Sequence, residues 1–432
     1  MAFSLLKANR AGVVFLSAFP ESGPNVQTQN RDMKRILFVD DEPLVLQGLE
    51  RMLHAMRREW DMRFASGGAQ ALQMMAETPA DVVISDMRMP NMNGAQLLNE
   101  IMRQYPKTVR FILSGFADQE MIMQCVGGTH QFLTKPCDGE TLRTVVGRAV
   151  GMDAWVNNDK IKGLVSRMES LPSLPTLYFQ IMDALGSPET TLDQVGVTIA
   201  QDPAMTAKML QMVNSAFFGL RRQIINPTEA VLQLGLETIK SLVLGIHVFS
   251  EFEEIKDSPF SLEKLWMHSL ATAGTARRIA QLERQERRIV EEAFTAGLLH
   301  DVGRLVLLTN LPRQYVEAIN QSKKTSVLLV ESERIVFGAS HAEVGGYLLG
   351  LWGLPGSLVE AVVFHHHPHD CQSQAFTPLT AVHAANVLEH ETAPDPLPFL
   401  RPEMDRQYLA QVGVLDHVPI WKTLPVGGDS SD

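Results

Sequence analysis

The first third of the chain alternates short apolar runs with amphipathic stretches. Five runs are rich in β-branched and apolar side chains, as expected for strands buried on both faces; they cover residues 35–40, 61–65, 81–86, 109–114 and 131–135. The stretches between them repeat apolar residues at helical spacing, as in PLVLQGLERMLHAM from Pro43. This alternation predicts an α/β domain with a parallel sheet between two layers of helices.

From residue 164 onward the strand pattern nearly vanishes and helical periodicity takes over. Helix starts are marked by Asp202-Pro203, by Asn226-Pro227 and by Ser340. Glu343 follows Ser340 by three residues, which is the spacing of a capping box. The runs after these caps have broad apolar faces and therefore belong in the interior of an all-α bundle.

Length indicates more than one domain. With 432 residues, the chain exceeds what one hydrophobic core usually organises. The apolar run within residues 7–19 follows basic residues as a signal peptide does, but it is much too short to span a bilayer. We predict a disordered extension (1–32), the α/β domain (33–150), a linker (151–163), the all-α domain (164–425) and a tail (426–432).

Composition fits a soluble globular protein. Apolar residues make up 45% of the chain and charged residues 20%. The net charge of -11 argues against a broad nucleic-acid-binding face, because such a face needs clustered Lys and Arg. Three scattered cysteines do not suggest a disulfide framework and fit a reducing compartment. We therefore expect a cytoplasmic protein.

Polar side chains end four of the five predicted strands. They are Asp40 and Asp41 on the first strand, Asp86 on the third, Ser114 on the fourth and Lys135 on the fifth. Since the carboxyl ends of parallel strands meet at one edge of a sheet, we expect these side chains to lie together. Crowded carboxylates need a cation, and hard oxygen ligands favour Mg²⁺, while Lys135 suits a phosphoryl oxygen. In the simpler alternative these acids cap helices and Ser114 forms a turn.

The segment resembles the receiver domain of bacterial response regulators, in the motifs VDDEP, SDMRMPNMNG, ILSG and FLTKP. The resemblance implies a flavodoxin-like, five-stranded parallel fold in a phosphorelay. It makes Asp86 the phospho-acceptor and Phe132 the aromatic switch, with a sensor histidine kinase as phosphoryl donor. The remaining implied roles are Mg²⁺ binding by Asp40, Asp41, Asp86 and the backbone carbonyl of Arg88, and phosphoryl contacts from Ser114 and Lys135.

Histidines recur in the helical part, in WMHS (266–269), AGLLHDVGRL (296–305), the stretch from Ser340 to Pro355 and HHHP (365–368). As a set, together with QDPAMTAKMLQMVNSAFFG (201–219), these motifs resemble the HDOD family, which is built on the HD phosphohydrolase helical fold. The resemblance implies a metal site. Its ligands would be His268, His300, Asp301, His341, His365 and His366, with Asn386 where catalytic HD enzymes carry an aspartate.

Two departures from the catalytic pattern decide the functional interpretation. Asn386 lacks the negative charge of an aspartate, and this loss costs several kcal/mol of attraction to a divalent ion, even at an effective dielectric constant of about 20. Arg304 stands where related hydrolases carry lysine, a group that can orient a substrate phosphate. Separately, no Gly-Tyr-Pro follows HHHP, so the cyclic-dinucleotide phosphodiesterase subgroup is not supported. Imidazole and carboxylate ligands would suit iron, manganese or zinc.

We therefore interpret the chain as a response regulator in which phosphorylation of Asp86 controls a largely non-catalytic HDOD module. That module would bind a downstream signalling protein or a nucleotide ligand. No helix-turn-helix is evident, so we expect no direct DNA binding, and a homodimer is compatible with the sequence. The alternative is a phosphorylation-gated, metal-dependent phosphohydrolase acting on a nucleotide or cyclic dinucleotide.

Overall fold

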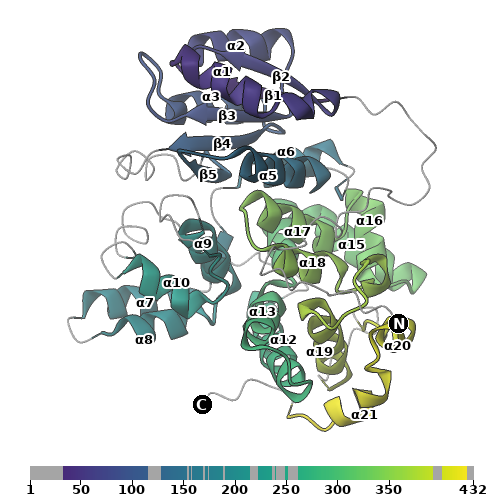
Figure 1. Cartoon of the computed structure of the whole chain (residues 1–432). Coiled ribbons are helices and arrows are strands. Elements are labelled where there is room, and N and C mark those ends of the chain that lie inside the picture. Colours follow the sequence, from purple (N-terminus) through teal and green to yellow (C-terminus); the bar gives the residue numbers. More distant parts are fainter. Residues whose placement is uncertain are drawn as a thin grey trace, which may run out of the picture.

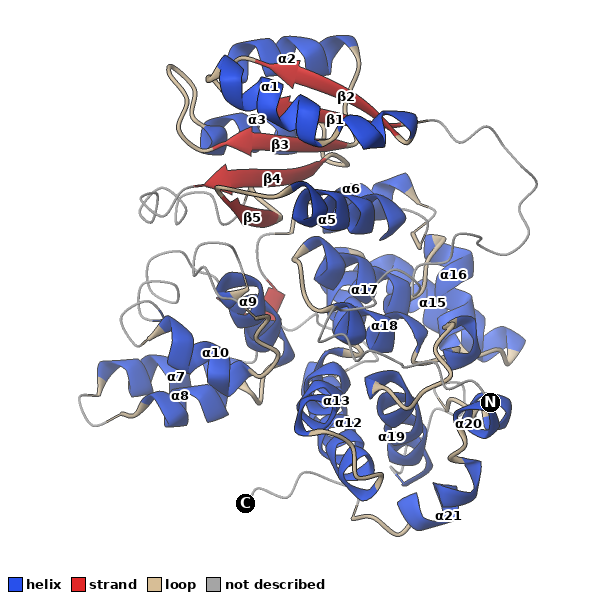
Figure 2. Ribbon diagram, in the orientation of Figure 1, coloured by secondary structure: helices blue, strands red, loops and turns tan. Residues whose placement is uncertain are grey.

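In the computed structural model, two domains lie against each other, with the α/β domain above the helical domain in Figures 1 and 2. The structure describes residues 33–114, 128–152, 155–156, 158–168, 171–173, 175–187, 190–214, 222–235, 239, 249–251, 261–392 and 401–425. The predicted extension (1–32) and tail (426–432) lie outside the described residues.

A five-stranded parallel sheet forms the first domain, in the order β2-β1-β3-β4-β5. The strands are β1 (Lys34–Val39), β2 (Trp60–Ala65), β3 (Val82–Asp86), β4 (Val109–Ser114) and β5 (Gln131–Thr134). All five predicted strands are thus confirmed to within a residue or so at each end. The central strands β3 and β4 are buried at every residue, because helices cover both faces of the sheet.

Alternate residues of each strand pack against different helices. The helices are α1 (Pro43–Met52), α2 (Gly68–Glu77), α3 (Gly94–Gln104) and α5 (Gly139–Gly151), with a 3₁₀ turn, η1 (His54–Arg58). Phe38 and Phe111 share a core with α1 and α5, whereas Leu37 and Ile112 share a core with α2 and α3. The helices cover the two faces of the sheet, so polar functional side chains are expected at the carboxyl ends of its strands.

Helices form most of the described part of the second domain. They are α6 (Asp159–Val165), α7 (Pro175–Gly186), α8 (Leu192–Ile199), α9 (Pro203–Val213), α10 (Pro227–Leu234), α12 (Leu262–Leu282), α13 (Arg287–Leu299), α14 (Val302–Asn310), α15 (Pro312–Thr325), α16 (Leu329–Phe337), α17 (His341–Leu351), α18 (Gly356–Phe364), α19 (Pro378–Thr392), α20 (Arg406–Val412) and α21 (Val418–Trp421), with 3₁₀ turns η5 (Pro368–Asp370) and η7 (Leu415–His417). In Figure 1, α7 to α10 form one lobe and α12 to α21 the other.

The predicted caps lie where the sequence placed them. Asp202 accepts the backbone N–H of Met205, Asn226 caps α10, and Ser340 with Glu343 forms a reciprocal capping box at the start of α17. One feature was not predicted, a parallel pair of three-residue strands, β6 (Leu171–Ser173) and β7 (Phe249–Glu251). Strands this short carry no period-two pattern. Among the described helices, none is long and apolar enough to cross a membrane.

Candidate phosphorylation and metal sites

The carboxyl edge of the sheet gathers acidic side chains around one lysine. Lys135, directly after β5, places Nζ 2.7 Å from Oδ2 of Asp40 and also contacts Oδ1 of Asp86. Asp40 and Asp86 are buried, and Asp41 beside them is partly exposed. Oδ2 of Asp86 accepts the backbone N–H of Arg88 at 2.6 Å. The predicted residues therefore converge, as the parallel topology requires.

Ser114 and Phe132 lie beside this cluster. Ser114 is buried at the end of β4, and its carbonyl oxygen accepts the backbone N–H of Lys135 at 2.9 Å. Phe132 pairs with Ile112 in the β4–β5 register and is buried in the core that faces α2 and α3. The predicted switch residues therefore lie on two adjacent strands, with the hydroxyl of Ser114 at the end of β4, the ring of Phe132 on β5 and the ammonium group of Lys135 directly after β5.

Burial and charge set the protonation of this edge. Burial raises the pKa of Asp86 above its ordinary value, and the hydrogen bond from Lys135 only partly opposes this. Burial alone would lower the pKa of Lys135, but its bonds to Asp40 and Asp86 outweigh burial and raise it. The lysine is therefore charged at neutral pH. The three carboxylates form a set of hard oxygen donors that fits Mg²⁺.

A second cluster lies inside the helical domain, where five helical segments contribute its seven members. They are His268 of α12, His300 and Asp301 between α13 and α14, His341 at the start of α17, His365 and His366 after α18, and Asn386 of α19. Asp301 is at the centre. Its carboxylate oxygens lie 3.1 Å from Nε2 of His341 and 3.5 Å from Nε2 of His300. The corresponding distances to His365 and His268 are 3.9 and 4.0 Å.

The cluster divides into two groups of candidate ligands. His268, His300 and Asp301 form one group, and within it one ligand atom per residue lies within 4.8 Å of the others. The same holds for His341, His365 and His366. Ligand atoms about 2.0–2.2 Å from one ion lie at most about 4.4 Å apart. Both groups are therefore close to the spacing that a bound cation requires.

Hydrogen bonds donated by Nδ1 orient three of the imidazoles. Nδ1 of His300 and of His365 lie 2.7 and 2.8 Å from the carbonyl oxygen three residues earlier. Nδ1 of His341 lies 2.6 Å from Oε2 of Glu333. A ring that donates from Nδ1 keeps its lone pair on Nε2. All three rings therefore present Nε2 toward Asp301.

Several polar atoms of the cluster remain unsatisfied. Within the described part of the chain, Nε2 of His300, Nε2 of His365, Nδ1 of His366 and both carboxylate oxygens of Asp301 have no hydrogen bond of acceptable geometry. Each buried imidazole nitrogen without a hydrogen-bond partner costs roughly 1–3 kcal/mol. Burial also lowers the pKa of His300, His365 and His366, which keeps these imidazoles neutral and able to bind a metal. The donor set fits a divalent transition metal.

Two side chains reduce the negative charge of the cluster. Nε of Arg304 lies 3.2 Å from Oδ1 of Asp301. Burial alone would raise the pKa of Asp301, but Arg304 and His300 outweigh burial and hold it well below its ordinary value. Oδ1 of Asn386 lies 3.1 Å from Nε2 of His268 and carries no charge. A carboxylate that already faces a guanidinium attracts a second cation less strongly.

Family models match both halves of the chain. The response regulator receiver domain matches residues 36–147, and the HDOD domain matches residues 171–368. The chain is a receiver domain followed by an HDOD domain. This combination indicates a response regulator with a signalling output domain. Receiver domains in general bind Mg²⁺.

Individual relatives resemble parts of this response regulator. An uncharacterized protein of Treponema pallidum (strain Nichols) is 25% identical over 48% of this chain and 40% of its own length. The response regulator protein PilR of Pseudomonas aeruginosa is 32% identical over 27% of this chain and 26% of its own. The chain thus spans less than half the length of these relatives. The crystal structure of the MmoQ response regulator from Methylococcus capsulatus is 26% identical, covers 59% of this chain and 98% of its own, and has a TM-score of 0.46.

Three residues of the HDOD domain escaped prediction. Glu333 of α16 and Tyr315 of α15 are buried beside His341. Nothing in the sequence around Glu333 marks it, because acidic residues are ordinary on amphipathic helices. The ring of His390 lies 4.5 Å from that of His268, and burial lowers its pKa to about 3. Its position four residues after Asn386 places both on one helix face, and that spacing could have identified it.

Proposed function

We propose that phosphorylation of Asp86 controls the HDOD domain of this response regulator. The observation that carries the proposal is the position of Lys135, whose ammonium group contacts both Asp40 and Asp86. A phosphoryl group on Asp86 adds roughly -1.5 to -2 charge and new acceptor oxygens. Lys135 would then shift its contacts toward that group. Phosphorylation of Asp86 would in this way move β5, the strand that Lys135 follows.

The acceptor chemistry assigns a role to each residue of the edge. A carboxylate oxygen of Asp86 forms a bond to the phosphorus of a phosphohistidine donor while the donor's P–N bond breaks, and the departing imidazole takes up a proton. Mg²⁺ bound by Asp40, Asp41, Asp86 and the carbonyl of Arg88 would supply charge neutralisation. In the phosphorylated state, the charge of the new group is met by Lys135 and Ser114.

Phosphotransfer can be tested directly on the purified chain. We expect incubation with a small-molecule phosphodonor and Mg²⁺ to add one phosphoryl group, read by intact mass, and Asp86→Asn to abolish the addition. Asp81→Asn is the matched control, because Asp81 lies at the opposite end of β3. A folded chain that stays unmodified, or an Asp86→Asn variant that is still modified, would refute the proposal.

For the HDOD domain we propose a signalling module that binds a partner protein or a ligand and retains a metal site. His268, His300 and Asp301 would hold one cation, and His341, His365 and His366 could hold another. The unsatisfied atoms on His300, His365, His366 and Asp301 support metal binding. Iron, manganese or zinc suits these ligands. The Arg304–Asp301 contact supports a module with little or no hydrolytic activity, since it already compensates the central carboxylate.

A second candidate function is metal-dependent phosphohydrolysis of a nucleotide or cyclic dinucleotide. The convergence of six candidate ligands, with Asp301 among them, favours it. A bound cation would polarise a phosphoryl oxygen and activate water. Metal analysis of the purified protein, followed by a substrate screen with wild type and His300→Ala, separates the two functions. Stoichiometric metal with turnover that His300→Ala abolishes favours the hydrolase, and metal without turnover favours the signalling module.

A further inference from the structure

The receiver domain contacts the HDOD domain through backbone carbonyls at helix ends. Nε2 of Gln131, the first residue of β5, donates to the carbonyl oxygens of Gly350 and Leu351 at 3.3 and 3.1 Å. Nη1 of Arg148, on α5, donates to the carbonyl oxygen of Leu354 at 3.1 Å. These acceptors lie at the carboxyl end of α17 and in the loop that leads to α18. The contact is therefore made with the hairpin of these two helices.

Apolar packing and the interdomain segment reinforce this contact. Gly350 packs closely against the buried Met152, just after α5: a Cβ added at Gly350 would lie 1.9 Å from Sδ of Met152, which would have to shift. Nδ2 of Asn158 donates to the carbonyl oxygen of Phe337 at 2.6 Å, at the end of α16. The hairpin and the helix before it are thus held from the receiver side at several points.

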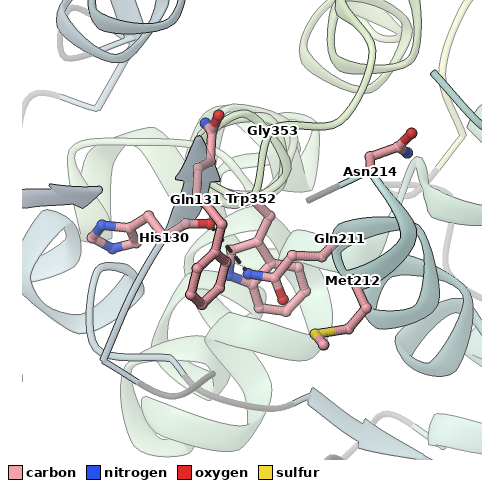
Figure 3. Close-up of a pocket in the computed structure, with 8 residues that line it drawn as sticks. His130, Gln131, Gln211, Met212, Asn214, Trp352 and Gly353 are labelled. Atoms are coloured by element: carbon pink, nitrogen blue, oxygen red, sulfur yellow. Dashed lines mark hydrogen bonds between the residues drawn. The ribbon is translucent and has the colours of Figure 1, made fainter. Parts of the chain in front are cut away.

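A small cavity marks the junction next to the predicted switch residue. It has a volume of about 30 Å³ and is lined by Phe132, Gln131 and Trp352 among others. Figure 3 shows His130 and Gln131 on the receiver side, with Gln211 reaching toward them from α9. Nε2 of Gln211 donates to the carbonyl oxygen of His130 at 3.4 Å. The residue just before the strand that carries Phe132 therefore also contacts the other helical lobe.

The same hairpin carries half of the histidine cluster. His341 is the first residue of α17, and His365 and His366 follow α18 directly. α17 is one unbroken helix about 16 Å long, at 1.5 Å per residue, between His341 and the carbonyls that Gln131 holds. The other group, with His300 and Asp301, belongs to α12 and to the junction of α13 and α14. A displacement of the hairpin would therefore move one group of ligands relative to the other.

The two groups of candidate metal ligands lie close together because α14 packs tightly against α17. α14 crosses α17 at Gly303, where an added Cβ would lie 1.9 Å from the carbonyl oxygen of His341. With the receiver bound as described, Nε2 of His341 lies 3.1 Å from Asp301. That separation suits two ligands of one ion. The arrangement with Asp86 unmodified is thus ready to bind metal.

We infer that the docked receiver domain holds the α17–α18 hairpin in its metal-binding position, and that phosphorylation of Asp86 releases it and weakens metal binding by the HDOD domain. The inference rests on the proposed function. Gln131 lies four residues before Lys135 and next to Phe132 on the short strand β5. A movement of Lys135 toward a phosphoryl group is transmitted along that strand to the hairpin. Coupling of this kind is reciprocal, so bound metal would also favour the unphosphorylated receiver.

The test is a Zn²⁺ titration of the full chain by calorimetry, with Mg²⁺ in excess, with and without beryllium trifluoride as phosphoryl mimic. For wild type we expect the mimic to lower the Zn²⁺ affinity by about 5-fold or more. The double variant Gln131→Ala with Arg148→Ala is expected to bind Zn²⁺ weakly, whether or not the mimic is present. The matched control, Gln73→Ala with Arg103→Ala, alters exposed residues of the same types on α2 and α3 and is expected to behave as wild type.

The outcomes separate this inference from the proposed function. An affinity that the mimic leaves unchanged or raises in wild type, or a mimic effect that persists in the interface variant, overturns the inference alone. In those cases the receiver would still take up the mimic, and Asp86→Asn would abolish this uptake. The chain would still bind Zn²⁺, and His341→Ala would abolish that binding. If the receiver takes up no mimic, or if the chain binds no Zn²⁺, the proposed function fails and the inference fails with it.

Discussion

Oε2 of Glu333 lies 2.6 Å from Nδ1 of His341, and neither side chain is exposed to solvent. The same oxygen accepts the backbone N–H of His341 at 2.8 Å, and Oε1 accepts the hydroxyl of Tyr315 at 3.0 Å. Burial alone would raise the pKa of Glu333, but His341 outweighs it and lowers the pKa. A charged carboxylate therefore fixes the tautomer and the direction of the imidazole.

We predict that Glu333→Gln lowers the metal affinity of the HDOD domain by about 10- to 100-fold, the usual cost of losing an outer carboxylate partner. The amide keeps the volume of the glutamate but supplies one acceptor oxygen for three donors. Zn²⁺ calorimetry measures the effect, with circular dichroism to establish that the variant is folded. Tyr315→Phe removes only the distal hydrogen bond and should change affinity less. Equal affinities for wild type and Glu333→Gln would show that Glu333 does not position His341.

Lys135→Ala should destabilise the receiver domain when Mg²⁺ is absent. It removes the cation from between Asp40 and Asp86 and leaves two buried carboxylates uncompensated, a loss of order 1–3 kcal/mol. Added Mg²⁺ should then raise the melting temperature of the variant more than that of wild type, because the ion replaces the missing charge. Thermal denaturation with and without Mg²⁺ measures both effects. Lys107→Ala, at an exposed ion pair with Asp159, is the control and should respond as wild type.

The acidic edge was predictable because its geometry follows from topology. Once the alternating pattern identifies parallel strands, Asp40, Asp86 and Lys135 have to meet at the carboxyl edge. No comparable rule places His268 beside His300, because helices can pack in many arrangements and their periodicity does not say which faces meet. The histidine cluster was expected from the family's motifs rather than from the pattern of the chain.

Other features depend on tertiary contacts that leave no local pattern. Glu333 becomes a partner of His341 only when α16 packs beside the start of α17, and the sequence around it is that of an ordinary surface helix. Gln131 is a polar residue at the start of a strand, where a solvent-exposed side chain would be expected. Its role at the domain contact emerges only when the carbonyl oxygen of Leu351 is placed opposite it.

Gly303→Ala should destabilise the HDOD domain and weaken its metal binding. The new Cβ would lie 1.9 Å from the carbonyl oxygen of His341, so α14 and α17 must separate. Overpacking against a rigid backbone costs about 1–3 kcal/mol or more. Urea denaturation and Zn²⁺ calorimetry measure the two effects. Gly48→Ala in α1, where a Cβ meets nothing within 4 Å, should instead stabilise the chain by about 0.4–1 kcal/mol.

Glu360 of α18 should make the stability of the chain fall as pH rises toward neutrality. Burial raises its pKa to about 7, against the attraction of Arg148 on the receiver domain. In the unfolded chain the carboxyl titrates near its ordinary value of 4.5. Between these two values the native state holds a proton that the unfolded state has lost, so the free energy of unfolding decreases with increasing pH. The effect is at most roughly 3.5 kcal/mol, since one pKa unit is worth about 1.4 kcal/mol.

A difference measurement isolates this contribution. Burial lowers the pKa of His268, His365 and His366, so these imidazoles give stability a slope of the opposite sign over part of the same pH range. Urea denaturation of wild type and Glu360→Gln from about pH 5 to pH 8 cancels them, because both proteins contain the same histidines. We expect the variant to gain stability relative to wild type as pH rises, with the gain levelling off above pH 7. A constant difference across this range would mean that Glu360 titrates alike in the folded and unfolded chains, and that the receiver and α18 do not bury it.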